Sequence, residues 1–198
     1  MSINRMGSGL ALIMAGAFFA PPALSHVSVA PKEAHVGAAY RAVLRVPHGC
    51  KGSPTTGIRV RIPEGVVGVK PQPKPGWTLE TVKGDYARSY TRHGAEVTSG
   101  VKEIAWKGGP LPDEHYDEFV FVTYLTDSLT AGRSLYFPVV QECEGGVERW
   151  IDVPDEKAGH GHGHGHDHGH DHGHGEGGAN SHDHSDSPAP AVKLLPAQ

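Results

Sequence analysis

The sequence predicts an all-β protein, an antiparallel β-sandwich followed by a disordered, histidine-rich C-terminal tail. Apolar and polar residues alternate with a period of two through residues 26–153, and no segment there carries the apolar stripe of an amphipathic helix. Clusters of Gly, Pro and Asp, such as KGGPLPD at 107–113, separate the alternating segments. From residue 155 the composition changes abruptly to Gly, His and Asp. Many short strands joined by turns favour a sandwich.

The segment GIRVRIPE at 57–64 shows the strand pattern most plainly. Its isoleucines and valine alternate with two arginines, which places one face of a strand in a core and the other in water. Further strands are predicted at residues 40–46, 101–106, 118–126, 135–141 and 147–153.

Residues 1–25 have the layout of a secretory signal peptide. Arg5 precedes the apolar run GLALIMAGAFFA, and Ala23 and Ser25 supply small residues at the −3 and −1 positions of a cleavage site. An uncleaved membrane anchor is the competing interpretation, but the run is shorter than the roughly 20 residues that span a bilayer. Cleavage after Ala23 is disfavoured because Pro21 would then occupy −3. We therefore expect a periplasmic protein that begins at residue 26.

Charge and cysteine content narrow the class of protein further. The formal net charge of −4 argues against a nucleic-acid partner. Two cysteines, Cys50 and Cys143, in an exported chain predict one disulfide. A cysteine metal site is the alternative, but neither residue lies in a CxxC spacing.

Cleavage after Ser25 would make His26 the first residue of the mature protein. The α-amino group and the imidazole of one residue can then close a chelate ring around a metal ion. The α-amine has a pKa near 8, so Cu(II), the strongest competitor among the divalent ions, can displace its proton at neutral pH. The alternative is that cleavage exposes a histidine by coincidence.

Four stretches together resemble the YcnI-like family of bacterial copper-binding domains. These are HVSVAPKE at 26–33, RVPHGCKGSPTT at 45–56, VKPQPKPGW at 69–77 and ERWIDVP at 148–154. The resemblance covers residues 26–154 and implies an immunoglobulin-like or cupredoxin-like β-sandwich. It also implies that one Cu(II) is bound by the amino-terminal histidine and an acidic side chain near it in sequence, with a tryptophan from a late strand beside the metal. The matching residues are His26, Glu33 and Trp150.

Glu33 and Trp150 each have a second interpretation. Glu33 would point away from His26 on a straight strand, so Pro31 must end or bend the strand if the two are to meet; otherwise Glu33 is a solvated surface carboxylate. The indole nitrogen of Trp150 is only a donor, so its role at a metal would be to present its π face and exclude water. Trp150 is otherwise a core residue, as we expect of Trp77 and Trp106.

Four further histidines lie in the predicted domain, namely His35, His48, His93 and His115. We expect them at the surface, since each lies among turn residues or in a loop. A two-histidine copper site, as in copper monooxygenases or CopC-like carriers, would need one of them beside His26.

The C-terminal segment 155–198 predicts a second kind of metal site. Ten of the fifteen histidines lie there, on a glycine-rich backbone that should bind Cu(II), Ni(II) or Zn(II) with low affinity because each bound loop must be ordered. They are His160, His162, His164, His166, His168, His170, His172, His174, His182 and His184. A plain linker or a cloning tag is the alternative.

The leading functional hypothesis is a periplasmic copper-binding protein, not an enzyme, that holds, buffers or delivers Cu(II). Its partners would be the metal ion and other periplasmic copper carriers or a membrane copper transporter. A copper-dependent redox enzyme using the same amino-terminal site is one alternative, and a zinc-binding or zinc-delivery protein is another. The absence of an evident second histidine disfavours the enzyme, and the amine-plus-imidazole chelate favours copper over zinc.

Overall fold

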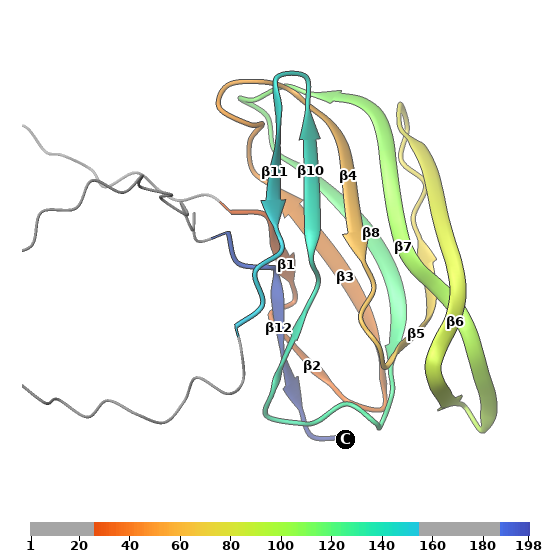
Figure 1. Cartoon of the computed structure of the whole chain (residues 1–198). Helices are drawn as coiled ribbons and strands as arrows, with labels where there is room; N and C mark the ends of the chain where they lie inside the picture. The colour runs from red at the N-terminus through yellow and green to blue at the C-terminus, as the bar shows by residue number, and fades with distance from the viewer. Residues whose placement is uncertain (1–25, 155–186) are drawn as a thin grey trace, which may run out of the picture.

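The computed structural model describes residues 26–154 and 187–198 (Figure 1). All regular structure in these ranges is β: β1 (Ser28–Ala30), β2 (Glu33–His35), β3 (Ala38–Val46), β4 (Thr55–Arg61), β5 (Val66–Pro71), β6 (Thr78–Arg92), β7 (Ala95–Leu111), β8 (Asp117–Leu125), β9 (Ser134–Tyr136), β10 (Val139–Cys143), β11 (Gly146–Trp150) and β12 (Ala191–Leu195). Within these ranges no helix has the length and apolar character needed to cross a membrane.

Two antiparallel sheets form the body of the protein. One has the strand order β1-β3-β8-β5 and the other β11-β10-β4-β7-β6. Their inner faces share one core, which contains the fully buried rings of Trp106, Phe119, Phe121 and Phe137. The predicted all-β sandwich is therefore confirmed. β4 shows why the pattern was informative, since its alternating apolar side chains are buried between the sheets.

The long hairpin β6-β7 was only partly predicted. Residues 101–106 were expected as a strand, but β7 runs from Ala95 to Leu111 and pairs with β6 over much of its length. β6 is an edge strand whose only buried side chains are Tyr86 and Tyr90. A strand exposed on both faces lacks the alternation by which strands are recognised.

The predicted strand 135–141 is divided between two sheets. β9 pairs with β12, whereas β10 pairs with β4 and β11. The break falls at Phe137 and Pro138, where proline has no amide hydrogen to donate to a ladder.

The prediction that residues 155–198 are disordered is wrong for residues 187–198. β12 lies in the middle of a third sheet of order β2-β12-β9, parallel to β2 and antiparallel to β9. Val192 and Leu194 of β12 are buried in the main core. The folded domain thus extends past the predicted boundary at 154. Strand AVKLL is short and follows a Pro/Ala-rich stretch, so only its tertiary neighbours identify it.

Asp152 joins the two described parts of the chain. Its amide donates to the Ser187 carbonyl (3.1 Å), its carbonyl accepts from the Ala189 amide (2.9 Å), and its carboxylate accepts from the Ser187 amide (3.3 Å). The residues that flank the segment 155–186 therefore lie side by side. The predicted tail histidines and the predicted signal peptide 1–25 fall outside the described residues.

The predicted disulfide between Cys50 and Cys143 is present, with Cα atoms 6.0 Å apart. It joins the loop between β3 and β4 to the end of β10. Because it closes a loop with a sequence separation of 93, the chain-entropy model gives a stabilisation of about 4 to 5 kcal/mol.

Candidate metal centre

His26 and Trp150 meet at one open edge of the sandwich. His26 precedes β1, an edge strand of the first sheet, and Trp150 ends β11, an edge strand of the second. The two ring centroids are 5.0 Å apart and the ring planes are perpendicular. Two candidate site residues that are far apart in sequence are thus in contact.

Trp150 belongs to the core and to this contact at the same time. Its side chain is 8% exposed and packs in the main core. Its indole Nε1 donates a hydrogen bond to Gln141 Oε1 at 3.1 Å. Because the polar atom is satisfied within the protein, only the π system of the ring is left for His26 or an ion beside it.

Gln141, which the sequence did not single out, fixes the position of Trp150. It is 1% exposed, and its Nε2 donates to the His48 carbonyl (2.8 Å) and to Thr55 Oγ1 (2.8 Å). A buried amide with all these bonds ties β10, β11 and the loop after β3 into one rigid unit. The signal in the sequence was a polar residue on the inward face of the predicted strand 135–141, the face that also carries Val139.

Glu33 lies apart from this pair. β1 ends at Ala30, so the chain does break at Pro31, whose carbonyl accepts a hydrogen bond from Tyr40 Oη at 2.7 Å. Glu33 then begins β2, opposite Lys193 of β12, with an exposed side chain. Among the described residues it forms neither a hydrogen bond nor an ion pair with His26.

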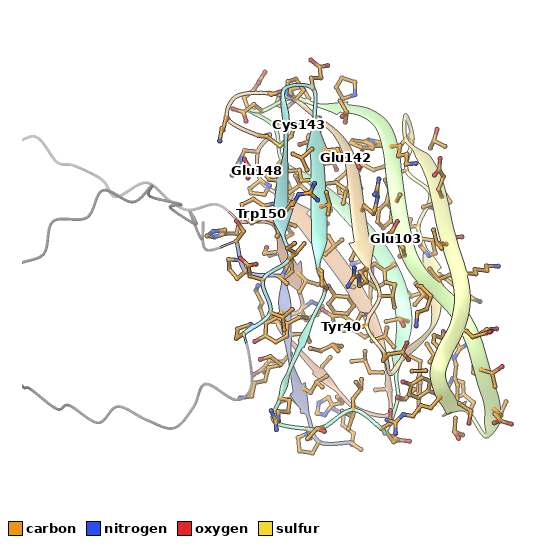
Figure 2. The ribbon with its side chains drawn as sticks, viewed as in Figure 1. Tyr40, Glu103, Glu142, Cys143, Glu148 and Trp150 are labelled. Atoms are coloured by element: carbon orange, nitrogen blue, oxygen red, sulfur yellow. A yellow bond between two sulfur atoms is a disulfide. The ribbon has the colours of Figure 1, made fainter. Side chains whose placement is uncertain are left out.

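Glu148 is a carboxylate that no pattern in the sequence distinguishes. It lies on β11 two residues before Trp150 (Figure 2). It is half-buried and pairs with Gln141 across the ladder. Residues two apart on a strand point to the same face, so Glu148 and Trp150 share a side of the sheet.

Two of the remaining histidines, His35 and His93, have side-chain contacts with residues other than His26. His35 Nδ1 contacts the Pro196 carbonyl (2.6 Å), and the His93 ring lies 5.1 Å from that of Tyr124. The His115 amide donates to the Pro112 carbonyl in a turn. Within residues 26–154 and 187–198 there is no group of three or more His, Cys, Asp or Glu residues able to hold a metal ion.

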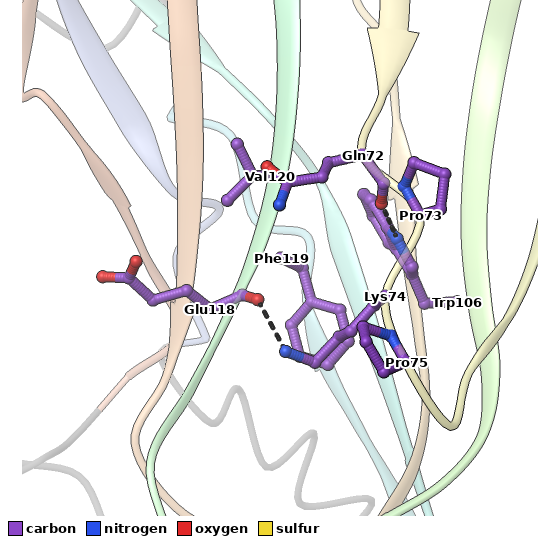
Figure 3. Close-up of a pocket in the computed structure, with 8 residues that line it drawn as sticks. All are labelled: Gln72, Pro73, Lys74, Pro75, Trp106, Glu118, Phe119 and Val120. Carbon is purple, nitrogen blue, oxygen red and sulfur yellow. Dashed lines mark hydrogen bonds between the residues drawn. The ribbon is translucent and has the colours of Figure 1, made fainter.

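Of the other two tryptophans, Trp106 is a core residue, as expected, whereas Trp77 is only partly buried and packs against the core. Trp106 is fully buried, and its Nε1 donates to the Gln72 carbonyl at 3.0 Å (Figure 3). The Trp77 ring packs against Phe119 at 4.9 Å. The pocket beside Trp106 is lined in part by Lys74, whose Nζ is paired with Asp117 Oδ1 at 2.6 Å, so its cation already has a partner.

A β-sandwich in which His26, just before the first strand, contacts a tryptophan of a late hairpin is the arrangement expected of a YcnI-like domain. A family model described as "Domain of unknown function (DUF1775)" matches residues 26–194, and the chain belongs to this family.

Two known proteins are similar to the chain. The copper-binding protein CutI of Bacillus subtilis (strain 168) is 36% identical over 143 residues, which are 72% of this chain and 63% of that protein. The chain therefore spans less than two thirds of the length of this relative. An uncharacterized protein from Nocardia farcinica, whose crystal structure has an immunoglobulin-like fold, superposes with a TM-score of 0.53 at 20% identity. That match covers 86% of this chain and 98% of the other, and it supports the fold alone.

Proposed function

We propose that the protein binds copper, and that it holds one Cu(II) through the α-amino group and imidazole of His26 beside the ring of Trp150. It would act in the periplasm after removal of residues 1–25, as a carrier or buffer that passes the ion to other copper carriers or to a membrane transporter. The contact between His26 and Trp150 is the observation that carries this proposal.

The family match supports the proposed amino terminus. It begins at residue 26, which is the residue that cleavage after Ser25 would expose. The relative from Bacillus subtilis carries copper binding in its name, which supports the choice of ion.

The donor set also favours copper. With no three-residue cluster among the described residues, this edge of the sandwich does not offer the closed ligand set of a structural zinc site. A single histidine that adds its own amine gives two nitrogen donors, and these suit a tetragonal Cu(II) site. Trp150 would shield one side of the ion and lower its exposure to water.

The histidines between 160 and 184 would add weaker capacity for Cu(II), Zn(II) or Ni(II). A free imidazole has a pKa near 6.5, so protons should compete with the metal as the pH falls through 6. These histidines would bind several metal ions weakly, while the His26 site would bind a single ion tightly.

The test is native mass spectrometry of the secreted protein after loading with Cu(II) or Zn(II). We expect an intact mass that begins at His26 and one Cu(II) that survives a competing chelator. Inserting Gly-Ser-Gly-Ser between Ser25 and His26 separates the terminal amine from the imidazole and should abolish this ion. Retention of the tight Cu(II) by the insertion variant, or tighter binding of Zn(II) than Cu(II), would contradict the proposal.

A further inference from the structure

A groove separates β2 from the first half of β3. The two strands are joined at Val36 and Gly37, whose amides donate to the Leu195 carbonyl after β12 begins and to the Leu125 carbonyl of β8. β2 thereby enters the small sheet and β3 the first sheet. β1 pairs with β3 only at residues 43–45, so it does not fill the space beside the start of β3. The cavity left between the two strands has a volume of about 380 Å³.

Fixed and mostly small side chains line this groove. Tyr40 is buried, and its hydrogen bond to the Pro31 carbonyl holds the start of β2 against β3. The His35 ring lies between the Pro196 carbonyl and Gln198 Nε2, at 2.6 and 2.8 Å. The remaining wall is apolar and consists of Ala34, Ala38 and Ala39. An apolar cavity of this size with a few polar groups is typical of a small-molecule site.

Two charges of opposite sign line the groove from different strands. Glu33 of β2 and Arg41 of β3 have exposed side chains that form no hydrogen bond or ion pair with another described residue. Lys193, opposite Glu33 in the ladder, forms no ion pair with it and does not line the groove. Elsewhere on the sheets such charges meet directly, as Arg59 and Glu142 do at 2.6 Å. The groove therefore presents a free carboxylate and a free guanidinium that one ligand can bridge.

We propose that this groove binds a small zwitterion with a free amino group and a free carboxylate, as in an α-amino acid or a short peptide. The ammonium group would lie at Glu33, and the carboxylate would accept two parallel hydrogen bonds from the Arg41 guanidinium, the geometry that arginine favours. Each buried charge of the ligand needs its own partner, so a molecule with one charge would leave one side of the groove unpaired. Neither His26 nor Trp150 lines the groove, so this site is distinct from the proposed copper centre.

The test uses the metal-free mature protein, because copper at His26 would itself bind an amino acid. Two-dimensional amide NMR spectra are recorded during titration with L-alanine, with di-L-alanine, and with acetate and ethylamine as probes of one charge each, at constant ionic strength. At least one zwitterion should shift the amides of residues 33–35 and 38–41 and saturate below about 10 mM, the range of weak specific binding. Acetate and ethylamine should not saturate. The tighter of the two zwitterions distinguishes a free amino acid from a peptide.

Matched variants assign the two charges. Glu33→Gln and Arg41→Gln should each weaken binding by at least about tenfold, because each removes one charge-assisted hydrogen bond. Glu96→Gln on β7 and Arg61→Gln on β4 change exposed charges outside the groove and should bind as the parent does. Dispersed spectra of the ligand-free variants check folding. Arg41→Lys keeps the charge but loses the paired donors, so it should weaken binding less than Arg41→Gln does.

Three results would overturn the proposal. These are no saturable shift with either zwitterion, acetate or ethylamine binding as tightly as the zwitterions, and equal binding by the parent and both groove variants. Copper binding is tested separately by the Gly-Ser-Gly-Ser insertion, so either hypothesis can fail without the other.

Discussion

Trp150 shows how one side chain can belong to a core and still contact His26 at the edge of the fold. From the sequence, a core position and a position beside a metal were alternatives for Trp150. In the structure the indole nitrogen is hydrogen-bonded to Gln141, while the ring contacts His26. A strand that ends at the rim of a sandwich allows this, because its last inward residue is packed on one side and open on the other. Burial alone therefore does not argue against a role beside a metal.

Replacing Trp150 with phenylalanine should separate these roles. Phenylalanine keeps an aromatic ring but cannot donate to Gln141 Oε1, so a buried acceptor loses its partner at a cost of roughly 1–3 kcal/mol. We expect a lower melting temperature and the loss of most Cu(II)-dependent quenching of tryptophan emission, because the quenched fluorophore is gone. Equal quenching in parent and variant would place the ion near Trp77 or Trp106 instead.

Glu64 is a second residue whose environment gives it a measurable role, in this case in stability. Its carboxylate accepts hydrogen bonds from Lys102 Nζ, Tyr90 Oη and the Ala87 amide. Burial acts to raise the pKa of Glu64, but these hydrogen bonds together outweigh it and hold the pKa below its ordinary value of 4.5. The group thereby connects the end of β4 to the hairpin β6-β7.

The lowered pKa of Glu64 predicts a pH dependence of stability. The unfolded chain takes up this proton at a higher pH than the folded chain, so the stabilisation is complete above 4.5 and is lost as the pH falls through the folded pKa. Glu64→Gln should flatten the fall in urea midpoint below that pH. The difference should be under about 1 kcal/mol because the side chain is 41% exposed. Parallel curves for parent and variant would contradict this.

Because β12 belongs to the folded domain, the histidine-rich segment is a connection between two of its parts and not a terminal tail. The segment 155–186 connects two parts of one folded domain, since β12 lies between β2 and β9. Cutting the protein off after residue 154 would remove a strand as well as the histidines. The two effects have to be separated before any loss of metal binding is assigned to the segment.

Removing residues 155–186 and removing residues 155–198 should therefore differ. The first deletion joins Pro154 to Ser187, which are already close because Asp152 bonds Ser187, and should leave stability nearly unchanged. The second also exposes the surroundings of Val192 and Leu194, which are worth about 1.5–3 kcal/mol each. Urea unfolding checks the difference, and equal midpoints would show that β12 contributes little.

For the whole molecule, the alternation of buried and exposed residues in β3, β4 and β8 was enough to predict a sandwich. The same rule could not find β6, which is mostly exposed apart from Tyr86 and Tyr90, or β12, whose burial depends on strands from distant parts of the chain. Which strands pair with which is decided by those distant contacts, as the place of β12 between β2 and β9 shows.

The candidate site was predicted unevenly for the same reason. His26 and Trp150 could be selected from the sequence because of their residue types and the family resemblance, and the fold brings them together. Gln141 and Glu148 could not, because their relevance depends on the register of β10 against β11. A glutamine or glutamate in a strand has no distinguishing feature until its neighbours across the ladder are known.

Because Asp152 is hydrogen-bonded to Ser187 and Ala189, the chain need not be continuous between residues 154 and 187 for its last strand to stay bound. Residues 187–198 are held to the domain by the bonds of Asp152, by two ladders and by buried side chains, none of which needs the peptide bonds of 155–186. A protease that cleaved there would leave a noncovalent complex in which the last strand is a bound peptide. The protein is thus in effect a receptor joined to its own ligand by a histidine-rich tether, and its two fragments should be able to reassemble after separate synthesis.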